Sequence, residues 1–333
     1  TVADYHDFQA IAQFAQSVDA VTLEFENVPV AAAEAAAHYV PVRPNGEALY
    51  TVQDRGREKG FLTASGIPCT PYRNVRTQSE IEAAVQELDC PAVLKTTKFG
   101  YDGKGQTVVQ TPGDADRAWN YLGRHKCVLE QFIDFRREIS VLIARGTDGE
   151  MRTCGPIENS HTNHILDVSV LAANEVATAT QTAAIEAAKK VAVELDLIGI
   201  ACVEFFEEMS GEVLVNEVAP RPHNSGHLTI EACATSQFEQ QARALAGLPL
   251  GEMHVLRPAA MANLLGDLWP LGDQRNCGEP HWGRLDEYPE VQLHLYGKQT
   301  ARPGRKMGHL TALADTPDEA ERLVRSARKA VTS

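Results

Sequence analysis

The chain has no hydrophobic run long enough to cross a membrane. Its 333 residues are 44% hydrophobic and 23% charged, which is the composition of an ordinary globular protein. No apolar stretch approaches the ~20 residues that a membrane-spanning helix needs, and no secretory signal is recognisable at the N-terminus. We therefore expect a cytoplasmic protein of two or three domains that has no membrane partner.

A surplus of positive charge and an ordered set of cysteines are also missing. The net charge of −14 argues against general binding to nucleic acid, so we expect no such partner, although a local cationic pocket is compatible with it. The seven cysteines are scattered, odd in number and without a C-x-x-C motif. This pattern disfavours a disulfide framework or a metal cluster and is typical of reduced thiols.

Two carboxylates face each other in a hairpin predicted for residues 201–218. Two short apolar runs flank a polar turn there, which is the pattern of a β-hairpin. With the turn centred between Ser210 and Gly211, a single register places Glu204 directly opposite Glu217. Like charges in this position destabilise a sheet unless a cation binds between them, and Mg²⁺ best suits oxygen ligands together with phosphates. The alternative is a pair of solvated glutamates on an edge strand.

A glycine-rich loop follows Lys95, which ends a strand predicted at residues 91–95. The loop Gly100-Tyr-Asp-Gly-Lys-Gly105 leads into another strand at residues 107–110. Glycines let backbone N–H groups approach phosphate oxygens, and lysines supply charge. The spacing is neither that of a Walker A motif nor that of a dinucleotide fingerprint. It predicts a hairpin flap over a nucleotide, and the alternative is a flexible hairpin with solvated lysines.

Further candidates for nucleotide binding lie on either side of this loop. A helix predicted over residues 45–65 carries Arg55 and Lys59. The strand that ends in Glu130-Gln-Phe-Ile133 can offer backbone groups to a base edge, and Glu138 can contact ribose hydroxyls. Together with the opposed carboxylates, these groups supply the metal, charge neutralisation and positioning that phosphoryl transfer from ATP requires.

A basic segment lies near the C-terminus. Residues 291–310 contain four Lys or Arg residues and no Asp or Glu, although the chain as a whole is acidic. The cluster consists of Lys298, Arg302, Arg305, Lys306 and His309. A loop of this kind after a strand indicates an anion pocket for a phosphorylated substrate, and the alternative is a solvated basic face.

The N-terminal part predicts a small parallel sheet. Helices alternate there with strands at residues 18–25 and 40–42, and this order is typical of parallel strands covered by helices. Glu24 and Glu26 then lie at the C-terminal end of a strand, where open α/β sheets bind ligands; the alternative is one buried partner and one solvated charge. Because so few elements cannot close such a sheet, we expect earlier strands to be missing from the chain as given.

Two long motifs resemble the ATP-grasp superfamily and, within it, the 5-(carboxyamino)imidazole ribonucleotide synthetases. They are Asn216-Glu-Val-Ala-Pro-Arg-Pro-His-Asn-Ser-Gly-His227 and Arg302-Pro-Gly-Arg-Lys-Met-Gly-His309. The resemblance implies an α/β (α+β) ATP-grasp fold in three domains. These are a truncated Rossmann-like domain at residues 1–54, an ATP-grasp domain at residues 55–246 with a lid at about 77–133, and a C-terminal domain at residues 247–333.

The resemblance also implies a reaction, its cofactors and its site. ATP and bicarbonate would carboxylate 5-aminoimidazole ribonucleotide through carboxyphosphate in de novo purine biosynthesis, with Mg²⁺ or Mn²⁺ and in a homodimer. ATP binding is implied for Arg55, Lys95, Gly100, Tyr101, Asp102, Gly103, Lys104, Gly105, Gln106, Glu130, Gln131, Phe132, Ile133, Glu138, His161, Asn216 and Glu217. Substrate binding is implied for Tyr101, Asp102, Lys298, Arg305, Glu26 and His223, and metal binding for Glu204 and Glu217. Catalytic roles are implied for Asp102, Lys104, Lys298 and Arg305.

One position departs from the pattern of the family, and other functions are alternatives. Arginine is expected at Lys104 at least as often as lysine, so the charge is kept and a bidentate fork is lost. Other ATP-grasp ligases are an alternative, either a formate-dependent glycinamide ribonucleotide transformylase or a biotin carboxylase-like protein. A non-catalytic nucleotide-binding module is another, and it predicts ATP binding without turnover.

Overall fold

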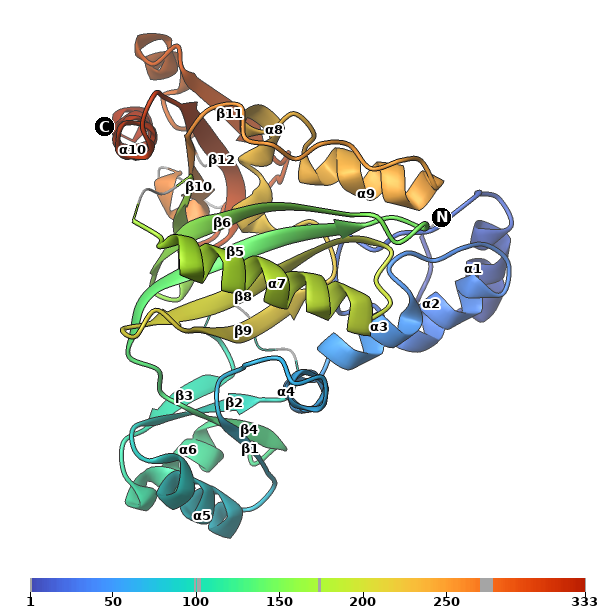
Figure 1. Ribbon diagram of the computed structural model, residues 1–333, viewed down its shortest axis with the longest axis vertical. Coiled ribbons are helices and arrows are strands. Elements are labelled where there is room, and N and C mark those ends of the chain that lie inside the picture. Colours follow the sequence, from blue (N-terminus) through green and yellow to red (C-terminus); the bar gives the residue numbers. More distant parts are fainter. Residues whose placement is uncertain (1, 99, 101–102, 173–174, 270–277, 333) are drawn as a thin grey trace.

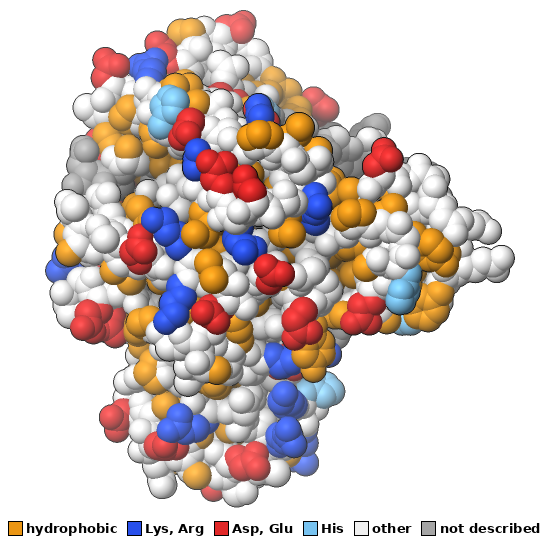
Figure 2. All heavy atoms as spheres, turned by 45° about the vertical axis from the view of Figure 1, so that its right-hand side comes forward, with side chains coloured by type: hydrophobic (Ala, Val, Ile, Leu, Met, Phe, Trp, Pro, Cys, Tyr) orange, Lys and Arg blue, Asp and Glu red, His pale blue; other side chains and the backbone are white. Residues whose placement is uncertain are grey.

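The computed structural model describes residues 2–98, 100, 103–172, 175–269 and 278–332. Figure 1 shows a large central sheet, a smaller lobe built on a second sheet, and a group of short helices near the N-terminus. On the face shown in Figure 2, acidic and basic side chains are interspersed. Among the described residues, no helix is both long and apolar enough to span a membrane.

Eight antiparallel strands form the central sheet in the order β11-β12-β10-β7-β6-β5-β8-β9. They are β5 Phe135–Arg145, β6 Met151–Thr162, β7 Ile165–Leu171, β8 Gly199–Glu208, β9 Val213–Ala219, β10 Ala259–Leu265, β11 Val291–Leu295 and β12 Lys306–Leu313. The sheet therefore connects the hairpin of the opposed glutamates at one edge with the C-terminal basic segment at the other.

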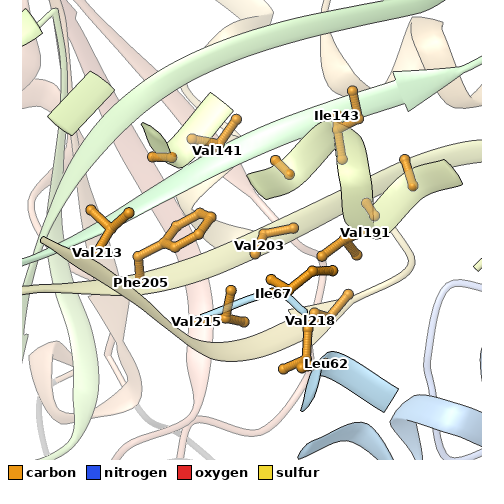
Figure 3. Packing of buried hydrophobic residues seen from close by; sticks show 14 of the residues in the cluster. Leu62, Ile67, Val141, Ile143, Val191, Val203, Phe205, Val213, Val215 and Val218 are labelled. Atoms are coloured by element: carbon orange, nitrogen blue, oxygen red, sulfur yellow. The ribbon is translucent and has the colours of Figure 1, made fainter. Parts of the chain in front are cut away.

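Helices cover both faces of the central sheet. They are α7 Thr178–Glu194, α8 Thr229–Ala232, α9 Gln237–Ala246 and α10 Pro317–Val331. Because successive strand residues point to opposite faces, Val141 packs with α7 while Leu142 packs with α8 and α9. Figure 3 shows the cluster on the α7 face, where β8 and β9 also meet Leu62. Glu204 follows Val203 of this cluster and therefore points to the face of α8.

The smaller lobe is built on four antiparallel strands in the order β1-β4-β2-β3. They are β1 Tyr72–Val75, β2 Ala92–Thr96, β3 Gln106–Val109 and β4 Cys127–Gln131, and α5 Gln78–Leu88 and α6 Ala115–Tyr121 pack on them. As predicted, Thr77 caps α5, because its hydroxyl accepts a hydrogen bond from the N–H of Glu80 at 3.2 Å. The predicted strands on either side of the glycine loop are β2 and β3.

The N-terminal part differs from the prediction in two respects. Its helices are α1 Phe8–Ala15, α2 Val30–Ala37, α3 Gly46–Val52 and α4 Arg55–Ala64. The strands predicted at residues 18–25 and 40–42 are wrong, since in the described part of the chain they meet only at one parallel bridge, between Val21 and Val42. The helix predicted over residues 45–65 is split, because Asp54 accepts hydrogen bonds from the first N–H groups of α4 and starts a new helix.

The β8–β9 hairpin contains the predicted pair without the predicted uniform register. Glu204 lies opposite Glu217, but Phe205 lies opposite Val215. Asn216 is therefore an extra residue, and it forms a β-bulge between the two halves of the hairpin. The turn is centred earlier in the chain than predicted, and the bulge corrects for this and brings the two glutamates together.

Candidate active site

The opposed glutamates each have a cationic partner from a different segment. Arg55 of α4 contacts Glu217, with 3.1 Å between Nη1 and Oε2. His223 contacts Glu204, with 3.0 Å between Nε2 and Oε1. Burial acts to raise the pKa of Glu204, but the charge and hydrogen bond of His223 lower that pKa to about 2. Glu204 is therefore ionised at neutral pH.

The donor set of this pair fits a hard cation that keeps other ligands. Among the residues that the structure describes, no three His, Cys, Asp or Glu side chains group together as a metal site. Glu204 and Glu217 thus offer two oxygen ligands and leave the other positions of a cation to waters or phosphates. Mg²⁺ is commonly bound in this way, by one or two carboxylates and the phosphates of a substrate.

A buried ion cluster lies at the end of β2 and β4. Lys95 donates a hydrogen bond to Glu130, with 3.0 Å between Nζ and Oε2, and Lys59 of α4 contacts the same oxygen at 3.5 Å. Burial acts to raise the pKa of Glu130, but Lys59 and Lys95 lower it to about 2. Burial also lowers the pKa of Lys95. Oε1 of Glu130 is buried without a hydrogen-bond partner.

The glycine loop packs against the site on both sides. The carbonyl oxygen of Gly100 accepts a hydrogen bond from Nη2 of Arg55 at 3.2 Å. Gly105 has a φ of +72°, and a Cβ atom there would lie 2.6 Å from Oγ1 of Thr96, so both conformation and space require glycine. Lys104 is exposed on the turn, while Tyr101 and Asp102 lie outside the described residues.

The segment that joins β4 to β5 lies between the two sheets. Phe132 is 46% exposed and donates its N–H to the carbonyl oxygen of Pro91 at 3.1 Å. Glu138 on β5 contacts His161 on β6. Burial acts to lower the pKa of His161, but the hydrogen bond and charge of Glu138 raise it. The structure therefore brings these predicted nucleotide ligands together at the end of the central sheet.

The basic segment reaches the N-terminal part of the chain. Burial and the charge of Arg305 lower the pKa of Lys298, and Glu24 acts in the opposite direction. Nζ of Lys298 donates to the carbonyl oxygen of Lys306 at 2.7 Å. Close by in the sequence of Glu24, Glu26 forms an ion pair with Arg221. Lys306 and His309 were expected on a loop but belong to β12.

Comparison with known proteins supports the same arrangement. The ATP-grasp domain family matches residues 60–238, the phosphoribosylaminoimidazole carboxylase C-terminal domain family matches residues 259–323, and the ribonucleotide synthetase preATP-grasp domain family matches residues 1–53. The N5-carboxyaminoimidazole ribonucleotide synthase of Bacillus subtilis (strain 168) is 42% identical over 317 residues, which cover 95% of this chain and 81% of that protein. The Pseudomonas aeruginosa enzyme of the same name is 40% identical over 309 residues, which cover 93% of this chain and 81% of its own.

The chain belongs to the N5-carboxyaminoimidazole ribonucleotide synthase family. Solved structures agree: an ADP complex of N5-carboxyaminoimidazole ribonucleotide synthetase has a TM-score of 0.89 at 38% identity and covers 98% of this chain and 84% of its own. The Aspergillus clavatus enzyme in complex with ADP and 5-aminoimidazole ribonucleotide has a TM-score of 0.88 at 29% identity and covers 99% and 86%. The predicted family, the ATP-grasp α/β fold and the class of ATP-dependent ligase are confirmed.

Two members of the site were not assigned a role by sequence reasoning in this N5-carboxyaminoimidazole ribonucleotide synthase family member. Glu58 and Lys59 are 2% and 1% exposed, and both contact β9 from α4. Burial and the charge of Glu217 raise the pKa of Glu58 to about 8. The available signal was a charged pair on the inward side of a helix, three and four residues after Arg55.

Proposed function

We propose that this chain uses ATP and bicarbonate to carboxylate 5-aminoimidazole ribonucleotide, with the reaction centred between the two sheets. One observation carries the proposal. The opposed carboxylates Glu204 and Glu217, each with a cationic partner, lie on the same site as the Lys95–Glu130 pair and the glycine loop. The substrate follows from the relatives, among which the Aspergillus clavatus structure holds ADP and 5-aminoimidazole ribonucleotide.

Nucleotide binding is assigned to both sides of the gap between the sheets. The buried oxygen Oε1 of Glu130 has no partner and can accept a hydrogen bond from the amino group of a base, beside the segment from Phe132 to Ile133. Glu138 and His161 are the candidates for the ribose. The phosphate ligands are Arg55, Lys95, Gly100, Gly103, Lys104, Gly105 and Gln106, joined by Gln131, Asn216 and Glu217 around the nucleotide.

Glu204 and Glu217 are the proposed ligands of Mg²⁺, or of Mn²⁺ in its place. When bound, the ion supplies charge neutralisation to the phosphates during phosphoryl transfer. Arg55 is close enough to both Glu217 and the glycine loop to orient the carboxylate toward the nucleotide. Asn216 at the bulge adds an amide to the same edge.

The chemical steps divide between two groups of residues. A bicarbonate oxygen attacks the γ-phosphorus of ATP, which gives carboxyphosphate and ADP, and Lys104 balances the charge of the new mixed anhydride. The amine of the aminoimidazole then attacks the carboxyl carbon, phosphate leaves, and the amine loses a proton. Tyr101 and Asp102 are assigned to that amine by the resemblance to the family. Lys298, Arg305, Glu26 and His223 hold the nucleotide substrate.

Phosphate release tests this function directly. We expect ATP hydrolysis by the protein to be stimulated by 5-aminoimidazole ribonucleotide and bicarbonate, and not by formate with glycinamide ribonucleotide. ATP binding without turnover under all of these conditions would contradict the proposal and favour a non-catalytic module. The homodimer and the cytoplasmic location stay predictions, and the sedimentation coefficient of the protein tests the first.

A further inference from the structure

Lys59 is a fully buried lysine to which the proposed function gives no role. It lies on α4, is 1% exposed, and has no carboxylate partner of its own, because its contact at 3.5 Å is to the oxygen of Glu130 that Lys95 already binds. Burying an ammonium group costs several kcal/mol unless its donors are used. The other contacts of Lys59 therefore carry information.

Those contacts are two backbone carbonyl groups at the β-bulge of β9. Nζ of Lys59 donates to the oxygen of Val215 at 3.3 Å and to the oxygen of Asn216 at 3.0 Å. Asn216 is the extra residue that shifts the register between Val215 and Glu217. A bulge leaves backbone groups without ladder partners, and the ammonium group of Lys59 satisfies them where the bulge occurs.

The neighbouring Glu58 holds the other side of the same bulge. Its Oε1 accepts a hydrogen bond from the N–H of Val218 at 2.7 Å. Consecutive residues of one helix thus bind the backbone immediately before and after Glu217. Figure 3 shows Leu62 of the same helix beside Val215 and Val218, so apolar packing fixes α4 against this edge.

We propose that Lys59 is a positioning residue that fixes the Asn216 bulge and so holds Glu217 opposite Glu204. Through Glu130 it also ties this edge of the central sheet to β4 of the smaller lobe, so the metal ligand and the nucleotide pocket keep one relative position. The inference rests on the proposed assignment of metal to Glu204 and Glu217. It adds that the register of β9 depends on one buried ammonium group.

ADP binding measured by calorimetry, with Mg²⁺ and with a chelator, tests this role. The wild-type protein should bind ADP more tightly with Mg²⁺. Residues that support metal ligands typically contribute 10–100-fold to metal affinity, so Lys59→Met should lose at least about tenfold of the Mg²⁺-dependent gain. Lys59→Gln, which keeps a donor for the carbonyl groups, should lose less. Lys190→Met is the matched control, because Lys190 donates to the carbonyl oxygen of Gly66 away from the site at 3.3 Å.

The outcomes separate this inference from the proposed function. A wild-type protein without any Mg²⁺-dependent gain would overturn the metal assignment and the inference together. A full gain in Lys59→Met would overturn the inference alone and leave the function in place. Cooperative thermal unfolding of both Lys59 variants and an unchanged KM for the aminoimidazole substrate are expected, since Glu130 keeps Lys95 and the C-terminal segment does not contact Lys59. An equal loss of ADP affinity with and without Mg²⁺ would also contradict a role at the bulge.

Discussion

Replacing Glu217 by glutamine should abolish ATP turnover while leaving the protein folded. The change removes one charge and keeps the shape of the side chain. A ligand of the proposed metal site is lost at the stage when phosphate charge develops, and we expect turnover to fall by at least about 100-fold, which corresponds to about 2.7 kcal/mol. Glu212→Gln, an exposed glutamate on the same hairpin, is the matched control.

The stability of the metal-free protein should change little, because two effects of similar size oppose each other. Directly opposed residues have Cβ atoms about 5 Å apart, and two charges at that distance repel by about 3 kcal/mol at an effective dielectric constant of about 20. The variant relieves this repulsion from Glu204. It also loses the ion pair with Arg55, whose value is about 1 kcal/mol or less at a carboxylate that is 40% exposed. Solvent screening reduces the repulsion to a comparable size.

Thermal unfolding and phosphate release together test this reasoning. Without metal, the Tm of Glu217→Gln should lie within about 2–4 °C of the wild type, which corresponds to about 1 kcal/mol in a protein of this size. With Mg²⁺ and ADP, the wild type should be stabilised and the variant should not. Turnover like that of the wild type, or a Tm that rises equally with Mg²⁺ and ADP in both proteins, would refute the assignment of Glu217 to the metal.

Two further predictions concern the substrate segment and the buried ion cluster. Lys298→Ala should raise KM for the aminoimidazole nucleotide about tenfold and leave KM for ATP nearly unchanged, since a charge-assisted hydrogen bond is lost; equal increases in steady-state assays would contradict its place in the substrate pocket. Glu130 has a pKa of about 2 in the folded protein against 4.5 as its ordinary value. A lowered carboxyl pKa stabilises the fold above pH ~4.5 by about 3 kcal/mol, and this is lost as the pH falls toward 2. Denaturant titrations should show that Glu130→Gln lacks this acid-dependent loss.

The hairpin shows both how far the sequence predicts the site and where it stops. The alternation of apolar residues and the charges at Glu204 and Glu217 were enough to predict that these carboxylates lie opposite each other. The bulge at Asn216 was not predictable from that pattern, because it depends on α4, whose residues Glu58 and Lys59 precede the hairpin by about 155 positions. A local pattern carries no information about such distant partners.

Elements that depend on tertiary partners were also the ones predicted incorrectly. The apolar runs around Val21 and Val42 have strand composition, yet in the described part of the chain they form one bridge, because a strand needs a neighbour to continue its ladder. The reverse holds for β12, where glycine and basic residues suggested a loop. Pairing with β10 on one side and β11 on the other overrides the low strand propensity of Gly308.

The charges of the site explain how an acidic chain can accept a polyanion. A net charge of −14 repels nucleotides at long range, and salt screens that repulsion within about 10 Å. Close to the site the sign is reversed, because Arg55, Lys59 and Lys95 come together at one place. Each is held by a carboxylate, Glu130 or Glu217, so the cations keep their positions before the nucleotide arrives. Recognition therefore depends on a few fixed and mostly buried cations, and a change such as Lys95→Met is expected to affect ATP affinity far more than a change of the same charge on the surface.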